Sequence, residues 1–133
     1  MNLEQRIELS RSRVFKAIFP GQTNHYETLF GGVALQWMDE VAFIAATRFT
    51  RERIVTVSSD RVNFKVPIPA GSLIELDAQV VKVGTSSIEV RVDVYKEDMY
   101  REFRELAMSG SFTMVAVDQE LKPVKIGTTV RAS

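Results

Sequence analysis

The sequence predicts an α+β domain in which one strongly twisted antiparallel sheet wraps around a single long helix. Three observations carry this prediction: one strongly apolar segment at residues 33–49, four strand-like segments after it, and short connections between those strands. A helix that is apolar on nearly every side is normally covered by other structure. A twisted sheet that curls around this helix would supply the cover.

The elements up to the helix follow in order along the chain. Residues 10–20 are rich in aromatic and β-branched side chains and end at a Pro-Gly pair, which predicts a first strand. Residues 20–30 predict an irregular loop that ends at two glycines. Residues 33–49 contain no proline and are rich in alanine, leucine and methionine, which favour a helix.

Four further strands are predicted at residues 54–67, 72–83, 86–95 and 106–117. In the first of them the apolar positions switch from odd to even numbers, which predicts a β-bulge within 58–61. The second and third are joined by a tight turn at 84–85 and should form an antiparallel hairpin. Gly110 predicts a close approach of another backbone or helix to the last strand. The tail from Asp118 is expected to be irregular and exposed.

Length and composition limit the classes of function. A chain of 133 residues with 45% hydrophobic side chains fits one domain over 1–133, with a core at about 10–125. Seventeen Lys and Arg balance seventeen Asp and Glu, so we expect no nucleic acid and no membrane as partner. Without cysteine, and with a single histidine, we expect no metal site. The absence of cystines favours a cytoplasmic protein.

Asp39 is the first candidate for chemistry, because it lies in the middle of the apolar helix. A carboxylate costs several kcal/mol to bury without a partner. Asp39 therefore either marks a narrow solvent-facing stripe with Glu40, or is held in a cleft as a general base or nucleophile. The sequence alone leaves both interpretations open.

A second group of candidates surrounds the start of the helix. Gly31 and Gly32 leave backbone N–H groups accessible, which suits a developing oxyanion, although a tight turn into a helix needs the same residues. In the preceding loop, Asn24 could orient a water molecule, and Thr28 could cap the helix or touch a ligand. The Ser-Ser-Asp run at 58–60 lies at the predicted bulge, where both an active-site position and ordinary turn chemistry are plausible.

Seven short motifs occur in order along the chain: TNHYETLFGG at 23–32, MDE at 38–40, VTV at 55–57, NFKVP at 63–67, PAG at 69–71, VGTSS at 83–87 and VAVD at 115–118. Together they resemble the hotdog-fold acyl-CoA thioesterases, and most closely the cytosolic long-chain or broad-range acyl-CoA hydrolase branch. The resemblance covers roughly residues 10–125.

The resemblance implies a hotdog fold, in which an antiparallel sheet of five or six strands wraps around a central helix. It implies hydrolysis of fatty acyl-CoA to free fatty acid and coenzyme A, with no cofactor, because coenzyme A is part of the substrate. It also implies a homodimer that pairs edge to edge with active sites at the interface, and hexamers built as trimers of dimers.

The resemblance also assigns roles to residues. Asp39 becomes the general base or nucleophile, Asn24 (or the nearer Thr28) the polar residue of the loop, and the amides of Gly31 and Gly32 the oxyanion hole. Contacts to the acyl-CoA would fall on Thr28, Ser59, Arg61, Lys65, Gly84, Thr85 and Ser86.

The chain departs from this family pattern at two places, and two other functions stay open. Tyr26 and Glu27 stand where many members have small residues and glycine, and Val66 stands where related enzymes often carry arginine. One alternative is a hotdog dehydratase or acyl carrier protein thioesterase, for which His25 could pair with a carboxylate. The other is a non-catalytic module that binds acyl-CoA.

Overall fold

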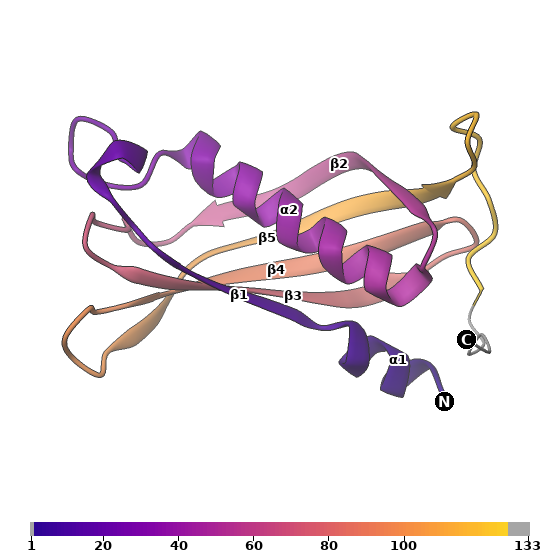
Figure 1. The fold of residues 1–133 in the computed structure, drawn as a ribbon, viewed down its shortest axis with the longest axis horizontal. Helices are drawn as coiled ribbons and strands as arrows, with labels where there is room; N and C mark the ends of the chain where they lie inside the picture. The colour runs from indigo at the N-terminus through magenta and orange to yellow at the C-terminus, as the bar shows by residue number, and fades with distance from the viewer. Residues whose placement is uncertain (1, 128–133) are drawn as a thin grey trace.

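A long helix lies across one face of an antiparallel sheet in the computed structural model, which describes residues 2–127 (Figure 1). The elements in chain order are α1 (Leu3–Ser10), β1 (Ser12–Ala17), the short 3-10 helix η1 (Pro20–Gln22), α2 (Gly31–Thr50), β2 (Arg53–Phe64), β3 (Leu73–Val83), β4 (Ser87–Glu97) and β5 (Arg104–Val117). The predicted α+β architecture, an antiparallel sheet against one long helix, is confirmed, with five strands in the sheet.

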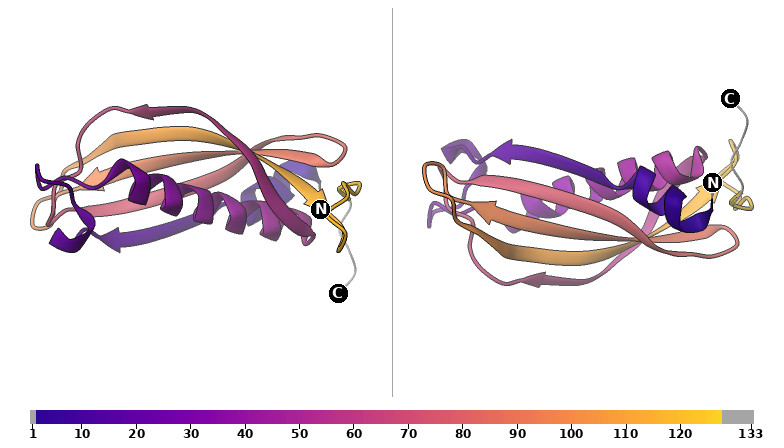
Figure 2. Two further views of the ribbon diagram at one scale, coloured as in Figure 1. Left: turned by 90° about the horizontal axis from the view of Figure 1, so that it is seen from above. Right: turned by 90° about the horizontal axis from the view of Figure 1, so that it is seen from below.

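The sheet has the strand order β1-β3-β4-β5-β2, and every neighbouring pair is antiparallel. The views from above and below show β1 and β2 on opposite sides of α2, with the sheet curved around the helix (Figure 2). Alanines 42, 45 and 46 of α2 are fully buried, and their small size allows the helix to approach the sheet closely. Within residues 2–127, β1 pairs only with β3 and β2 only with β5, so the outer edges of both strands are open.

The N-terminal part differs from the prediction. Residues 3–10 form helix α1, so the first strand is shorter than the predicted 10–20. The cause is a capping box, in which the Asn2 side chain accepts from the Gln5 amide and the Gln5 side chain accepts from the Asn2 amide. Helix α2 begins two residues earlier than predicted, at Gly31. No helix among residues 2–127 is long and apolar enough to cross a bilayer.

The sheet curves around α2 as predicted, but it does not cover the whole helix in the single chain. The sheet covers one side of the helix, and Phe43 on the other side remains 44% exposed. On the open strand β2, Val57 and Phe64 are exposed as well. The molecule therefore presents apolar surface along α2 and the open edge of its sheet.

The expectation of an exposed tail from Asp118 is wrong in part for residues 118–127, and residues 128–133 lie outside the described part of the chain. Ile126 is only 2% exposed and belongs to the core, and its amide donates to the Thr85 carbonyl. The Arg6 guanidinium of α1 donates to the carbonyl oxygens of both Phe49 and Gly127. Helix α1 and the tail therefore meet at the C-terminal end of α2.

Strand β2 contains two irregularities, one of them at the predicted place. The pairing with β5 shifts at Val57 and again between Asp60 and Asn63, so that the second shift includes Arg61. Arg61 adopts a left-handed backbone with φ 54°. Gly110 on β5 lies opposite this second bulge, and a Cβ atom there would lie 3.0 Å from Cγ2 of Val62 and 3.2 Å from Cε of Met38. The predicted close approach at Gly110 is confirmed.

We expect Gly110→Ala to lower the free energy of unfolding by about 1–3 kcal/mol, because the added methyl group overpacks the contact between α2 and the bulge. Denaturant unfolding measures the change. Gly21→Ala is the control, because nothing lies within 4 Å of the added Cβ atom. An equal loss of stability in both variants would contradict the packing argument.

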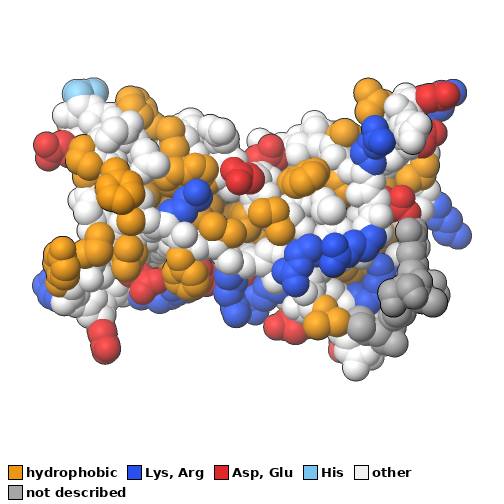
Figure 3. All heavy atoms as spheres, in the orientation of Figure 1, with side chains coloured by type: hydrophobic (Ala, Val, Ile, Leu, Met, Phe, Trp, Pro, Cys, Tyr) orange, Lys and Arg blue, Asp and Glu red, His pale blue; other side chains and the backbone are white. Residues whose placement is uncertain are grey.

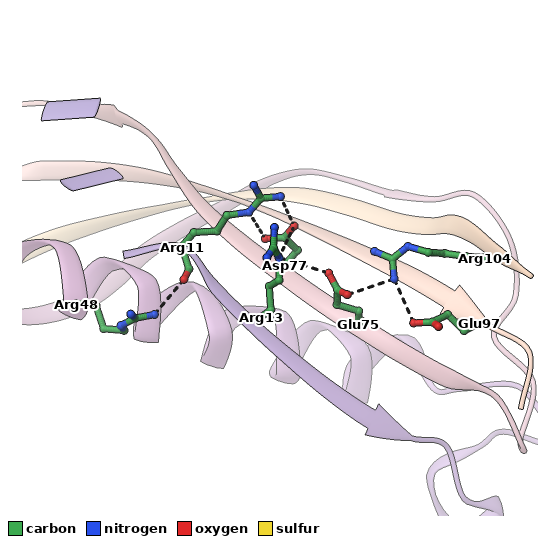
Figure 4. A network of polar contacts seen from close by, with 7 residues as sticks. All are labelled: Arg11, Arg13, Arg48, Glu75, Asp77, Glu97 and Arg104. Carbon is green, nitrogen blue, oxygen red and sulfur yellow. Dashed lines mark hydrogen bonds and ion pairs between the residues drawn. The ribbon is translucent and has the colours of Figure 1, made fainter. Parts of the chain in front are cut away.

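On the face of the sheet away from α2, two acidic side chains of β3 lie under arginines (Figure 4). Glu75 and Asp77 are each only 7% exposed. Arg11 donates to both carboxylate oxygens of Asp77, from Nε at 2.9 Å and from Nη2 at 2.6 Å, and Arg104 donates to Glu75 at 3.2 Å. The hydrogen bonds from Arg11 are the main reason that the pKa of Asp77 is lowered.

This pair predicts a pH-dependent contribution to stability. Because the folded state lowers the pKa of Asp77, its ionised form stabilises the fold above the unfolded-state pKa of about 3.9, and this contribution disappears as the pH falls through the folded-state pKa. We expect Asp77→Asn to lower the free energy of unfolding by about 1.5–3 kcal/mol at neutral pH.

Urea unfolding between pH 7 and pH 2.5 tests this expectation, and the difference between wild type and Asp77→Asn should shrink below about pH 4. Asp93→Asn is the control, because Asp93 pairs with the exposed Arg91 and should cost at most about 1 kcal/mol. A difference for Asp77→Asn that stays constant over the whole pH range would contradict the pairing.

Candidate active site

A cleft of about 260 Å³ opens at the start of α2. Its lining combines the loop before the helix, the first turn of α2, the end of β2 with the segment after it, and β5: Thr28, Leu29, Gly31, Ala34, Phe64, Lys65, Val66, Pro67, Ile68 and Met108. Figure 3 shows hydrophobic side chains gathered mainly over the end of the molecule where α2 begins. Lys65 is the charged residue of the lining.

The first amides of α2 point toward this end of the molecule. The N-cap residue Phe30 has no side-chain acceptor, so no capping side chain accepts a hydrogen bond from the free N–H groups of the first turn. Gly31 lines the cleft, and a Cβ atom there would lie 3.5 Å from the Phe64 ring. Nothing lies within 4 Å of the corresponding position at Gly32. The positive end of the helix dipole therefore faces an open space that could hold an oxyanion.

Asn24 organises the loop before the helix. Its side-chain oxygen accepts hydrogen bonds from the Tyr26 amide at 2.9 Å, the Thr28 amide at 3.2 Å and the Thr28 hydroxyl at 3.1 Å. Asn24 thus holds Thr28 at the cleft wall. Glu27 has φ 62°, in the left-handed region that glycine occupies most easily.

Asp39 is partly buried on α2, whereas its neighbour Glu40 faces solvent. The hydroxyl of Thr56 donates to Oδ1 of Asp39 at 2.8 Å. Thr56 pairs with the fully buried Met114 of β5, which places the Thr56 side chain on the helix-facing side of the sheet. Sequence reasoning quoted Thr56 within a motif but assigned it no role, because the contact depends on how β2 lies along α2.

The cleft and Asp39 are separate within one chain. Asp39 comes eight residues after Gly31, which corresponds to about 12 Å along the helix axis. One carbonyl group cannot touch the Gly31 amide and the Asp39 carboxylate of the same chain. A site in which the Gly31 amide and the Asp39 carboxylate both act on one carbonyl group therefore needs two copies of the chain.

The remaining predicted contact residues lie in two other places. Ser59 and Arg61 are exposed on β2. Gly84, Thr85 and Ser86 form the turn between β3 and β4, where the Thr85 carbonyl accepts from the tail. This turn lies at the end of the molecule opposite the cleft (Figure 1). Of the predicted residues, the structure brings Thr28, Gly31 and Lys65 together in the cleft.

Among residues 2–127, no group of three or more His, Cys, Asp or Glu side chains lies close enough together to hold a metal ion. The polar groups near the cleft are instead backbone amides, hydroxyl groups and one lysine. Such groups can bind and polarise a carbonyl oxygen, and a carboxylate such as Asp39 can activate water or attack directly.

Comparisons with known proteins show the family to which the chain belongs. A family model described as the thioesterase superfamily matches residues 26–102. A Bacillus subtilis protein named as an uncharacterized acyl-CoA thioester hydrolase is 42% identical over 121 residues, which cover 90% of this chain and 70% of the relative.

Two solved structures are similar over most of the chain. The acyl-CoA hydrolase of Staphylococcus aureus, in complex with butyryl coenzyme A, coenzyme A and coenzyme A disulfide, has a TM-score of 0.87 and 35% identity, covering 92% of this chain and 74% of that one. A hexameric acyl-CoA thioesterase in its apo form has a TM-score of 0.89 and 34% identity, covering 96% and 81%. The chain described here belongs to the hotdog-fold thioesterase superfamily.

Proposed function

We propose that this protein hydrolyses the thioester of acyl-CoA to a free carboxylic acid and coenzyme A. The observation that carries the proposal is the hydrogen bond of 2.8 Å that holds the Asp39 carboxylate against Thr56. Structures of the Staphylococcus aureus enzyme have been solved for three mutants, in which an aspartate, a threonine or an asparagine is replaced by alanine. Its aspartate and threonine are 17 positions apart, as Asp39 and Thr56 are, and its asparagine precedes the aspartate by 15, as Asn24 does.

In the proposed reaction, the thioester carbonyl oxygen accepts hydrogen bonds from the amides of Gly31 and Gly32. Asp39 takes a proton from a water molecule while the water oxygen forms a bond to the carbonyl carbon. The negative charge that develops on the carbonyl oxygen is stabilised by the helix N-terminus. When the oxyanion collapses, the carbon–sulfur bond breaks, and the coenzyme A thiolate leaves and takes up a proton.

A second route starts with the same residues. Asp39 could attack the carbonyl carbon directly, release the thiolate and form a mixed anhydride, which water then hydrolyses. Both routes consume only the thioester and water, so the proposal invokes no cofactor. We keep the cytoplasm as the predicted compartment, because the chain has no cysteine with which to form cystines.

The proposed site is shared between two copies of the chain. The open edge of β2 invites pairing with another strand, and a two-fold axis would pair it with β2 of a second copy. Two helices related in this way run in opposite directions, so the amide end of one can lie beside Asp39 of the other. The exposed Phe43, Val57 and Phe64 supply apolar surface for this interface, and a similar enzyme is hexameric.

Replacing Asp39 tests the reaction itself. We expect Asp39→Asn to lower kcat for thiol release from acyl-CoA by about 10²–10⁴-fold, because the amide cannot act as a base or nucleophile. Release of the thiol, followed with a chromogenic disulfide, measures the rate, and circular dichroism checks the fold.

Glu40→Gln is the matched control, since it removes the adjacent but exposed carboxylate and should retain wild-type activity. Activity of Asp39→Asn close to that of wild type would remove Asp39 from the mechanism. Hydration of an enoyl thioester without thiol release would favour the dehydratase, and tight binding without turnover would favour the binding module.

Mixed oligomers test whether the site is shared. Gly31→Pro deletes one amide donor but suits the first helical position, because the preceding Phe30 is extended with φ −59° and ψ 133°. Losing one such donor should cost about 10²–10³ in kcat. Co-expression of Gly31→Pro chains with Asp39→Asn chains should restore about half of the wild-type rate in each mixed dimer, since one of its two sites is then intact.

Gly31→Ala is the control for the proline, because it keeps the amide and meets the Phe64 ring at an ordinary contact distance of 3.5 Å. A mixture that is no more active than the two separate variants would show that the Gly31 amide and Asp39 of two copies do not act together in one site. Light scattering on the purified protein gives the size of the assembly, and a monomer at micromolar concentration would contradict the proposed interface.

A further inference from the structure

The floor of the cleft at the start of α2 consists of buried apolar side chains. Leu29, Ala34, Ile68 and Met108 are each at most 9% exposed, and they come from the loop, the helix, the segment after β2 and β5. The polar and charged groups of the lining, Thr28 and Lys65, lie outside this buried set. The cleft thus has an apolar floor below a mouth that contains the first amide of α2.

The backbone around the floor is already satisfied by hydrogen bonds. The amide of Leu29 donates to the Ile68 carbonyl at 2.8 Å, and the amides of Lys65 and Val66 both donate to the Ala107 carbonyl. A ligand that enters the floor therefore meets hydrocarbon and no unpaired amide of these residues. Such a cleft favours a molecule with an apolar chain at one end and a hydrogen-bond acceptor, such as a carbonyl oxygen, where the chain leaves the floor.

The volume of the cleft limits the length of such a chain. A dry cavity of about 150 Å³ holds benzene, which has six carbons. At the same volume per carbon, a cleft of about 260 Å³ holds about ten carbons. Met108 occupies the β5 side of the floor with a long unbranched side chain, and Ala34 occupies the helix side with a single methyl group. Changing these two side chains would change the available length in opposite directions.

We propose that this cleft holds the acyl chain of the substrate, that it limits efficient substrates to acyl groups of about ten carbons or fewer, and that Met108 and Ala34 set this limit. The inference rests on the proposed thioesterase function and extends it to the class of acyl group. The carbonyl carbon then lies at the mouth of the cleft, next to the Gly31 amide, and the coenzyme A moiety extends outward from there.

The test compares kcat/KM for saturated acyl-CoA substrates of two to sixteen carbons. Wild type should be most efficient near eight to ten carbons and at least tenfold less efficient at sixteen. Met108→Ala deepens the floor and should move the optimum to longer chains, by about the length of the side chain removed. Ala34→Leu fills the cleft and should move the optimum to shorter chains, so that the two variants shift in opposite directions.

Met114→Ala is the matched control, because Met114 lies on the same face of β5 and is fully buried but does not line the cleft. Its profile should keep the wild-type optimum even where its absolute rate is lower. The inference is overturned if wild type hydrolyses acyl-CoA while all three variants keep its optimum, or if Met114→Ala shifts as far as Met108→Ala.

Binding of the same acyl series as non-hydrolysable thioethers, measured by calorimetry, provides a readout that does not need turnover. Affinity should rise with chain length up to about ten carbons in wild type, and the rise should end earlier in Ala34→Leu. A protein that binds the series in this way but releases no thiol from any acyl-CoA would contradict the proposed hydrolysis and leave the acyl cleft supported. Affinity that does not depend on chain length would overturn the acyl cleft.

Discussion

The fixed distance along helix α2 between Gly31 and Asp39 is the constraint on which the proposed chemistry depends. A helix is rigid over two turns, so the distance between its amide end at Gly31 and the carboxylate of Asp39 is set by the number of residues between them. Neither a loop movement nor a side-chain rotation can bring these two groups of one chain to one carbonyl carbon. Assembly of copies thereby becomes a condition of the proposed reaction and not only a source of stability.

The packing of the sheet fixes the position of α2. Fully buried alanines let α2 lie close to β3, β4 and β5, and both Val62 of the β2 bulge and Met38 of α2 lie over Gly110. On the reverse face of the sheet, Arg11 and Arg104 cover Asp77 and Glu75. Contacts on both faces of the sheet thus stabilise the interior, while the outer edge of β2 and one side of α2 stay exposed.

Much of this architecture could be predicted from the sequence. The long apolar segment without proline predicted the helix, the alternation predicted the strands, and the parity switch predicted a bulge within 58–61, where one of the two register shifts of β2 includes Arg61. The place of Gly31 and Gly32 at the start of α2 could be predicted because two glycines mark a turn into a helix locally, whereas their role toward an oxyanion stays a prediction. The partnership of Asp39 with Thr56 could not be predicted, since it depends on the register of β2 beneath α2. Helix α1 was missed although the capping box of Asn2 and Gln5 was present in the sequence.

The contact of Arg6 with both Phe49 and Gly127 has a practical consequence. It gathers the first and the last described residues at the end of α2 that is remote from the cleft (Figure 1). A fluorescent label on an exposed residue of α1, such as Glu4, would therefore lie away from the cleft of its own chain.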